Sequence, residues 1–532
     1  MALKGLHCMN RRDLLSMLAG APVAALAAGT LRAHAQTTPA SALTYGQSTG
    51  VVTLDPAHGS YTLYPGGSEA ALCIYDGLLT FDPEMKIVPQ LAQSWTMAPD
   101  LRACTLKLRT GAHFHDGTPV DVAAVKANLE RLMDKQRNPT NRPLWDPLAG
   151  VETPDANTVV IRLSQPFPQL PNSLAHISGA LVSPAAIAKF GDTGIAKNPV
   201  GAGPYRVVTF DPGQQLVLEA FDTYWGGKPK TARLTLKAIS EPSTRVSALR
   251  TGAVDIIDSV PVALVSQLKQ DPAIAVIAVP GLRPIGFVIN LTRPKLADPR
   301  VRQALNLAVP VEAIASKVFF GYARAPDSPL AFNTEGYAPV SKLVHDPAKA
   351  KSLLAEAGFG PTKPLELAMF FSQGLFPGDV SVGEVVANAL TQVGVKVEIT
   401  KIEAGSYWDA MRQDRANLKW DLAMFGFNPA NASGLYHLTS LFKSNADDAT
   451  RPDVWNLGRY RNPEVDRLLA AAGTEADRSE AVADLAKAQS LIWNDYPYIW
   501  LQINENVDAV RKTVTGVEVW PSLFTNVRHA AV

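Results

Sequence analysis

Apolar and polar residues alternate over Ala103–Arg109 and then change to a helical spacing over Val122–Met133. Strict alternation is the two-residue period of a half-buried strand, whereas apolar residues three and four apart give a helix one apolar face. Between them, residues 113–117 form a predicted tight turn. Thr118 fits the N-cap of the helix, and Asp121 fits the reciprocal position of a capping box. The stretch therefore predicts a strand, a turn and a capped helix, in that order.

Similar patterns continue along the chain. Residues 151–163 are typical of a hairpin. Residues 365–402 contain a strand, an amphipathic helix and a second strand, which is the pattern of a βαβ unit with a right-handed crossover. Residues 281–290 and 498–510 are extended segments, and the first fits a strand that crosses into a second lobe. The residue pattern alone predicts an α/β protein with more than one domain.

The composition is that of an ordinary globular protein, and the charge argues against two classes of binding partner. The 532 residues are 47% hydrophobic and 19% charged, which is enough for two or three domain-sized units with a large core. The formal net charge is +1, but residues 1–35 are basic, so the rest of the chain is slightly acidic. A near-neutral body argues against nucleic acid and against an anionic membrane surface as a partner.

The first 35 residues have the features of an export signal. Arg11 and Arg12 precede a small-residue apolar run at 17–31, and Ala33–Ala35 fits the small-x-small rule for cleavage. Cleavage there predicts a mature chain that begins at Gln36. The paired arginines favour the twin-arginine route. A general secretory signal that happens to contain two arginines is the alternative, and a membrane anchor is disfavoured because the run is barely long enough to span.

The three cysteines indicate no disulfide framework. Cys8 leaves with the signal, and Cys73 and Cys104 have neither CxxC nor metal-ligand spacing. A disulfide between the last two could persist in an oxidising compartment. Two buried thiols that behave as small hydrophobic residues are the favoured interpretation.

Several motifs occur in a characteristic order. PQLAQSW occupies 89–95, LRTG 108–111 and FHDG 114–117, and NPVGAGPYRVVTF and YWGGKP follow at 198–210 and 224–229. Together they resemble the family 5 solute-binding proteins of ABC importers, which take up peptides, nickel, opines and related solutes. The resemblance extends over essentially the whole mature chain.

The resemblance implies a fold like the type II periplasmic binding proteins, with two lobes joined by two crossing strands. We expect the lobes to open and close at these crossings, near 281–290 and 499–506. After the signal at 1–35, the implied division is a lobe I core from 36–75, 201–283 and 506–532, an extra subdomain inserted in that lobe at 76–200, and lobe II at 284–505.

The implied function is that of a solute receptor. It would capture a peptide-like or related small solute between its lobes and deliver it to an ABC permease in the inner membrane. Such a protein is not an enzyme, requires no cofactor or metal and binds no nucleic acid. It is expected to be a monomer and, after signal cleavage, soluble in the periplasm.

Other functions are possible on the same sequence. Gly46–Gly50 matches GxSxG, so an exported serine hydrolase that uses Ser48 is one alternative, although the motif requires a strand before the serine and a helix after it. A periplasmic chaperone or sensor on the same fold is another. His113, His115 and Asp116 imitate a metal cluster, but their turn context favours a structural role.

The family's dipeptide receptors bind the ligand amine with an Asp and its carboxylate with an Arg. By position those places fall on Ala430 and near Gly374-Leu375, so both charged anchors are missing. Because an unpaired charge is costly to desolvate, we expect a solute other than a simple dipeptide, such as an opine-like, capped or sugar-like compound. In the alternative interpretation Phe427 is core and the two polar residues after it make a turn. The predicted ligand-binding residues are Ser60, Tyr61, Trp145, Phe427, Asn428, Asn431 and Ser433.

Overall fold

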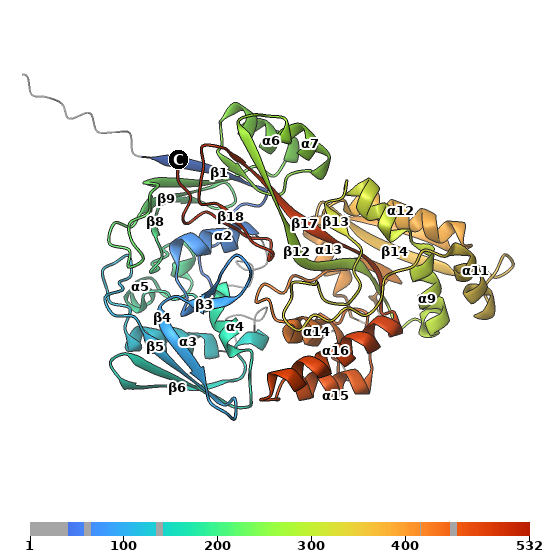
Figure 1. Ribbon diagram of the computed structural model, residues 1–532, viewed down its shortest axis with the longest axis horizontal. Helices are drawn as coiled ribbons and strands as arrows, with labels where there is room; N and C mark the ends of the chain where they lie inside the picture. The colour runs from blue at the N-terminus through green and yellow to red at the C-terminus, as the bar shows by residue number, and fades with distance from the viewer. Residues whose placement is uncertain (1–40, 58–64, 135–141, 415–416, 447–454) are drawn as a thin grey trace, which may run out of the picture. The chain divides into compact units, whose positions relative to one another are not determined.

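Two long antiparallel strands form the middle of the structure, a computed structural model that describes residues 41–57, 65–134, 142–414, 417–446 and 455–532. Strands β12 (Ile274–Ile289) and β17 (Tyr498–Arg511) pair along most of their length (Figure 1). Their register shifts between Pro280 and Pro284, where proline cannot donate to the ladder. The two crossing segments predicted from the sequence are these strands.

The large sheet continues on both sides of this pair. Its order is β15-β14-β16-β12-β17-β11-β1-β10-β9-β8, with β13 (Ala323–Arg324) beside β17, which makes eleven strands within the described residues. On the β17 side the strands are β11 (Ile256–Ile257), β1 (Ala42–Gln47), β10 (Arg233–Ala238), β9 (Gln215–Ala220) and β8 (Tyr205–Asp211).

The β12 side of the sheet contains the predicted βαβ unit. Strand β14 (Glu366–Gln373) is followed by helix α12 (Asp379–Gln392) and by β15 (Lys396–Glu403), which pairs with β14 in parallel. Strand β16 (Leu422–Gly426) lies between β14 and β12. The carboxyl ends of the parallel strands β14 and β16 therefore lie side by side, with β12 next to β16, at the sheet edge where α/β proteins commonly bind ligands.

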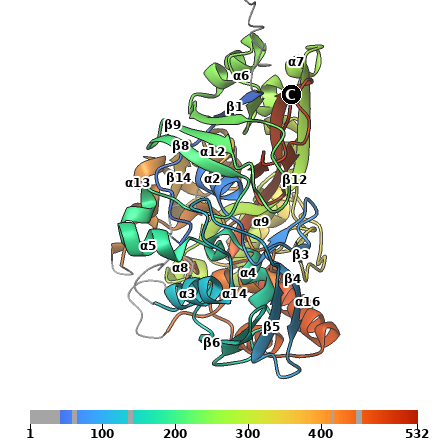
Figure 2. The same cartoon turned by 90° about the vertical axis from the view of Figure 1, so that its left-hand side faces the viewer.

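A second sheet is formed by the stretch that opened the sequence analysis. Strands β4 (Ala92–Met97), β5 (Ala103–Leu108), β7 (Thr158–Leu163) and β6 (Leu148–Asp155) pair in that order, near α3 (Val122–Met133) (Figure 2). A small hairpin, β2 (Leu79–Phe81) and β3 (Ile87–Pro89), precedes them. Residues 41–532 form one compact unit, and the predicted limits of lobes and subdomain stay predictions.

The predicted start of α3 was wrong by three residues. Asp121 is the N-cap, and its side chain accepts a hydrogen bond from the backbone N–H of Ala124. Thr118 donates instead to Asp116, which also accepts from Ser183 at 2.6 Å. The FHDG turn thus uses its own polar groups, and a carboxylate closer to the apolar run caps the helix better.

The turn also connects the second sheet to the main one. His115 Nε2 lies 3.0 Å from the carbonyl oxygen of Gly203, in the rigid bend before β8. Burial lowers the pKa of His115, so the ring is neutral at physiological pH. His115 thus makes a structural contact between the turn and the bend before β8.

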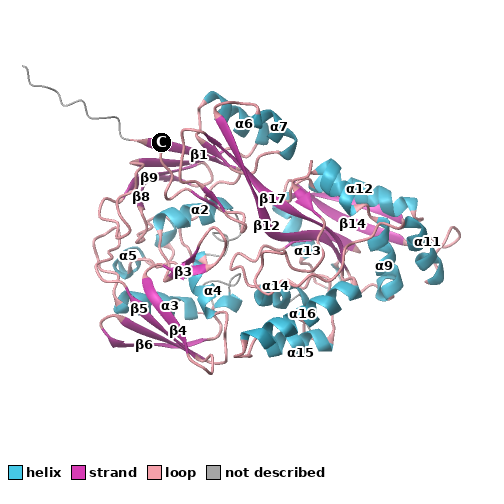
Figure 3. Ribbon diagram, in the orientation of Figure 1, coloured by secondary structure: helices cyan, strands magenta, loops and turns pink. Residues whose placement is uncertain are grey.

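The remaining helices surround these sheets (Figure 3). No helix in the described ranges has the length and apolar character needed to span a membrane. Cys73 and Cys104 are free and buried, and burial raises the pKa of each thiol to about 12, as expected for structural thiols. The remaining helices that surround the sheets are α2 (Pro65–Ile74), α4 (Leu170–Ala175), α5 (Pro184–Phe190), α6 (Pro242–Thr251), α7 (Val265–Lys269), α8 (Pro294–Ala297), α9 (Pro299–Ala308), α10 (Val311–Ala313), α11 (Pro347–Glu356), α13 (Ala404–Met411), α14 (Gly434–Phe442), α15 (Pro463–Ala472) and α16 (Arg478–Asp495).

Candidate functional site

The loop between β16 and α14 contains four of the predicted ligand-binding residues. Ser433 caps α14, because its Oγ accepts from the backbone N–H of Tyr436 at 3.2 Å. Asn431 accepts from the backbone N–H of Ser433 at 3.3 Å. Both side chains therefore shape the turn, which was the alternative interpretation, while contact with a solute stays a prediction for them.

Phe427 begins a band of aromatic side chains in this part of the structure. Its ring centre lies 5.8 Å from that of Tyr436 and 6.1 Å from that of Trp455. Trp455 lies 5.7 Å from Trp408, which lies 6.3 Å from Phe376 at the end of β14. Phe427, Trp455 and Trp408 are only partly buried against the core, so the band keeps accessible apolar surface. Such surface suits a solute with an apolar or planar part.

The same loop contacts elements that the sequence assigns to the other lobe. Asn172 of α4 donates to the carbonyl oxygen of Asn431 at 3.0 Å. Asn428 donates to the carbonyl oxygen of Ser522 at 2.8 Å, and Ala432 is buried in the core cluster that includes α4. Segments far apart in the chain therefore meet around residues 428–432.

Several buried polar atoms near these contacts have no partner among the described residues. Gln502 on β17 is fully buried, and neither its amide nitrogen nor its amide oxygen is hydrogen-bonded. Asn428 Oδ1, Asn431 Nδ2 and Ser522 Oγ are also buried and unpaired. Buried polar atoms normally have a partner, so these atoms are available to hydrogen-bond to a bound solute or to water.

Arg283 is a charged residue of this region, together with Glu335, which lies 3.4 Å from Asn172, and Arg412, which lies over Trp455. Arg283 lies on β12, and its side chain crosses Gly426, where a Cβ would lie 3.2 Å from Cγ and 3.3 Å from Cδ of the arginine. The guanidinium carbon is 5.4 Å from the centre of the Phe376 ring. Desolvation by the surrounding protein lowers the pKa of Arg283 to about 10, which leaves it charged at neutral pH.

The remaining predicted site residues are elsewhere. Trp145 is buried with 1% exposure, and its indole N–H donates to Ser178 at 3.2 Å, so its contacts are those of a core residue. Ser60 and Tyr61 lie outside the described residues. The sequence analysis missed Arg283 and Gln502, although a charged and a polar residue within the two predicted crossing strands were a usable signal.

Ser48 lacks the surroundings of a nucleophile. Residues 49–56 contain no helix, and Ser48 Oγ donates to Asp258 at 2.6 Å. A carboxylate acceptor orients this hydroxyl, and among the described residues no histidine hydrogen-bonds to it. Within the described residues no group of three or more His, Cys, Asp or Glu side chains is placed to hold a metal ion.

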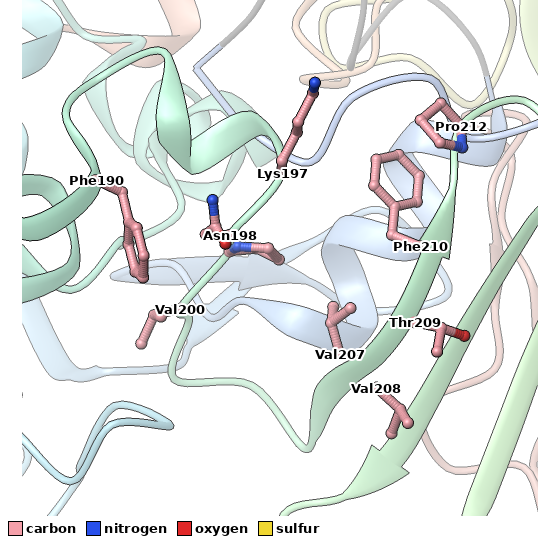
Figure 4. Close-up of a pocket in the computed structure, with 10 residues that line it drawn as sticks. Phe190, Lys197, Asn198, Val200, Val207, Val208, Thr209, Phe210 and Pro212 are labelled. Carbon is pink, nitrogen blue, oxygen red and sulfur yellow. The ribbon is translucent and has the colours of Figure 1, made fainter.

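A pocket in the structure lies between residues 190–200 and β8 (Figure 4). It is lined mainly by apolar side chains such as Phe190, Val207 and Phe210, together with Lys197. None of its lining residues belongs to β12, β17 or the loop before α14. It is therefore separate from the region around Arg283.

Sequence comparison matches the family of bacterial extracellular solute-binding proteins, family 5 Middle, to residues 86–449. The glutathione-binding protein GsiB of Pectobacterium atrosepticum is 32% identical over 478 residues, which are 89% of this chain and 90% of GsiB.

Structure comparison gives the same picture. DppA of Helicobacter pylori, in complex with the peptide STSA, superposes with a TM-score of 0.79 at 24% identity, covering 92% of this chain and 98% of DppA. AgaA of A.tumefacien R10, in complex with agropinic acid, has a TM-score of 0.76 at 28% identity, covering 91% of this chain and 96% of AgaA. The fold of these periplasmic binding proteins thus extends over about nine tenths of the chain.

Proposed function

Because this chain belongs to the family 5 bacterial extracellular solute-binding proteins, the receptors of ABC importers, we propose that it captures a peptide-like or related small solute where its two lobes meet. The observation that carries the proposal is the region around residues 427–433. There, contacts between sequence-distant segments, an aromatic band and unpaired polar atoms occur together. The loaded receptor then docks on a membrane permease.

Binding is coupled to movement of the lobes about β12 and β17. These two strands are the sheet connection between the β14–β16 side and the β11–β8 side. A solute that touches both sides binds the closed arrangement more tightly than the open one, and this difference in affinity drives closure. No energy-transducing step is required of this chain.

The solute differs from a simple zwitterionic dipeptide. The position of the amine-binding Asp of the dipeptide receptors is occupied by Ala430, which packs against a core cluster. An ammonium group brought there would be desolvated without a carboxylate partner, at a cost of several kcal/mol. GsiB is named for glutathione and AgaA was solved with agropinic acid, and a modified or acidic peptide-like solute agrees with both.

The receptor works outside the cytoplasm. Arg11 and Arg12, the apolar run after them and Ala33–Ala35 support export by the twin-arginine route, cleavage before Gln36 and release into the periplasm as a monomer.

Calorimetry with the exported protein tests this function. Glutathione and a panel of dipeptides are titrated into wild type and into Phe427→Ala. We expect ordinary dipeptides to bind weakly and any tight binding to fall in the variant, because Phe427 loses its aromatic contact. Submicromolar binding of ordinary dipeptides that the substitution leaves unchanged would show that the site is placed wrongly. Labelling of Ser48 by a fluorophosphonate probe would favour the hydrolase instead.

A further inference from the structure

Arg283 differs from the other enclosed arginines in its partners. Arg245 donates to the backbone carbonyl groups of Asp258 and Ile239. Arg302 donates to the carbonyl groups of Asp495 and Ala297, and Arg528 forms an ion pair with Asp76 at 2.6 Å. Arg283 has no hydrogen bond or ion pair with any described residue, and its one close polar interaction is with the face of Phe376. Since enclosed arginines normally use their donors, Arg283 is left with a free set of five N–H groups.

The guanidinium group of Arg283 is largely surrounded by protein but keeps some accessible surface. The neighbouring protein desolvates it strongly, and no carboxylate offsets that effect on its pKa. Yet none of its nitrogens is among the fully buried atoms that lack a partner, so they keep accessible surface. A cation that is surrounded by protein but still accessible is placed to meet a small ligand. Tyr436 is similar, because it is partly exposed while burial raises the pKa of its hydroxyl to about 12.

Gln502, whose buried amide has no partner among the described residues, lies on the strand that pairs with this part of β12. Gln502 stands opposite Ile285 in the ladder of β17 and β12, and paired residues point to the same face. A Cβ built on Gly426 would lie 2.8 Å from Cγ1 of Ile285 and 3.2 Å from Cγ of Arg283, so these two side chains lie on the same face beside β16. The surroundings thus contain the guanidinium of Arg283, the neutral amide of Gln502 and the aromatic ring of Phe376.

We propose that Arg283 receives a carboxylate of the bound solute, which is therefore a small organic acid whose acidic group lies beside the end of β16, close to Phe376 in the segment that follows β14. The planar fork of Arg283 matches a carboxylate with two parallel hydrogen bonds. A second cation, Arg412, lies over Trp455 in the aromatic band with its guanidinium carbon 4.8 Å from the ring centre, but Arg283 is the one beside Phe376. The inference rests on the proposed function, because it names the chemistry of the solute that this site binds.

The test compares acids with their uncharged counterparts on the exported full-length protein. Glutathione, N-acetyl-L-phenylalanine and N-acetyl-L-glutamate are each titrated by calorimetry beside the matching ester or amide. The variants are Arg283→Gln, Arg283→Lys and the control Lys363→Gln. Lys363 also lies over an aromatic ring, 5.9 Å from Phe359, but is exposed and precedes β14, at the opposite end of that strand from Phe376.

We expect at least one acid to bind wild type and Lys363→Gln equally. Its neutral counterpart, and Arg283→Gln with the acid, should each bind roughly 30- to 1,000-fold more weakly. Arg283→Lys should fall between, because lysine keeps the charge but loses the fork. If Arg283→Gln does not fold, the affinities of the wild-type protein for each acid and for its ester or amide still test the inference.

Equal binding of an acid and its neutral counterpart by wild type would overturn the inference, and so would undiminished binding of the acid by Arg283→Gln. Both results leave a working solute receptor, so the proposed function would survive them. If wild type binds neither member of any pair, the carboxylate inference is also wrong. In that case the proposed function is also wrong only if the exported protein releases no small molecule when it is denatured.

Discussion

Asp508 is a carboxyl group buried in β17, and its replacement by asparagine is expected to stabilise the protein at alkaline pH. The side chain is 3% exposed and accepts hydrogen bonds from the backbone N–H of Ser259 and the hydroxyl of Thr525. Desolvation, followed by repulsion from Asp258, raises its pKa to about 7. The ordinary value for an aspartate is about 4.

The sign of the effect follows from proton binding. Between about pH 4 and pH 7 the folded protein holds a proton on Asp508 that the unfolded chain has released, so this group's contribution to stability falls as pH rises and then levels off. A difference of about 3 pKa units corresponds to about 4 kcal/mol. Asparagine keeps the shape and stays neutral, and the Thr525 hydroxyl can turn to accept from its amide.

Urea denaturation at pH 5 and pH 8 measures this difference. Asp508→Asn should match wild type within about 1 kcal/mol at pH 5 and exceed it by up to about 4 kcal/mol at pH 8. Burial lowers the pKa of His176 to about 4 and that of His437 to about 3, so their contribution to stability rises with pH, opposite to that of Asp508. Both histidines are present in variant and wild type, so the difference between the two proteins at each pH does not contain their contribution. Asp222→Asn, at an exposed site paired with Lys228, is the control and should change little. An equal effect of Asp508→Asn at both pH values would refute the reasoning.

Two further predictions concern other parts of the chain. Arg528→Met should lower the free energy of unfolding by about 3–5 kcal/mol, because it leaves the buried Asp76 without its ion-pair partner at 2.6 Å, and exposed Arg206→Met is the control; a loss below about 1 kcal/mol in urea denaturation would contradict this. Replacing Arg11 and Arg12 with lysine should stop export, so that the precursor stays in the cytoplasm; N-terminal sequencing of exported wild-type protein should begin at Gln36, and retention of Met1 would disprove cleavage.

Elements with a strong local pattern could be predicted from the sequence. The βαβ unit of β14, α12 and β15 and the hairpin of β6 and β7 form where the periods change, because each buries one apolar face. The two crossing strands were also expected, and the type II periplasmic binding protein fold is confirmed. The start of α3 could not be fixed, since Thr118 and Asp121 are both good caps and only the folded turn decides between them.

The candidate site was harder to predict. Phe427 and the asparagines near it were predicted by position in the loop after β16. The structure places Phe427 beside Trp455 and uses Asn431 in the turn, and their contact with a solute stays a prediction. The same reasoning searched for charge only in loops that follow strands, so it missed Arg283, which reaches the end of β14 from β12. Which side chains meet there depends on the sheet order β14-β16-β12, a long-range pairing that residue periodicity does not contain.

The most direct test of the central claim is small-angle scattering of the exported protein as it is emptied and refilled. The protein is unfolded in guanidinium chloride, freed of small molecules by dialysis and refolded, and the released small-molecule fraction is then added back. The account predicts that this fraction contains a small organic acid and that adding it lowers the radius of gyration, because the bound solute favours the closed lobes. An unchanged radius when this fraction is present in excess would contradict capture by lobe closure.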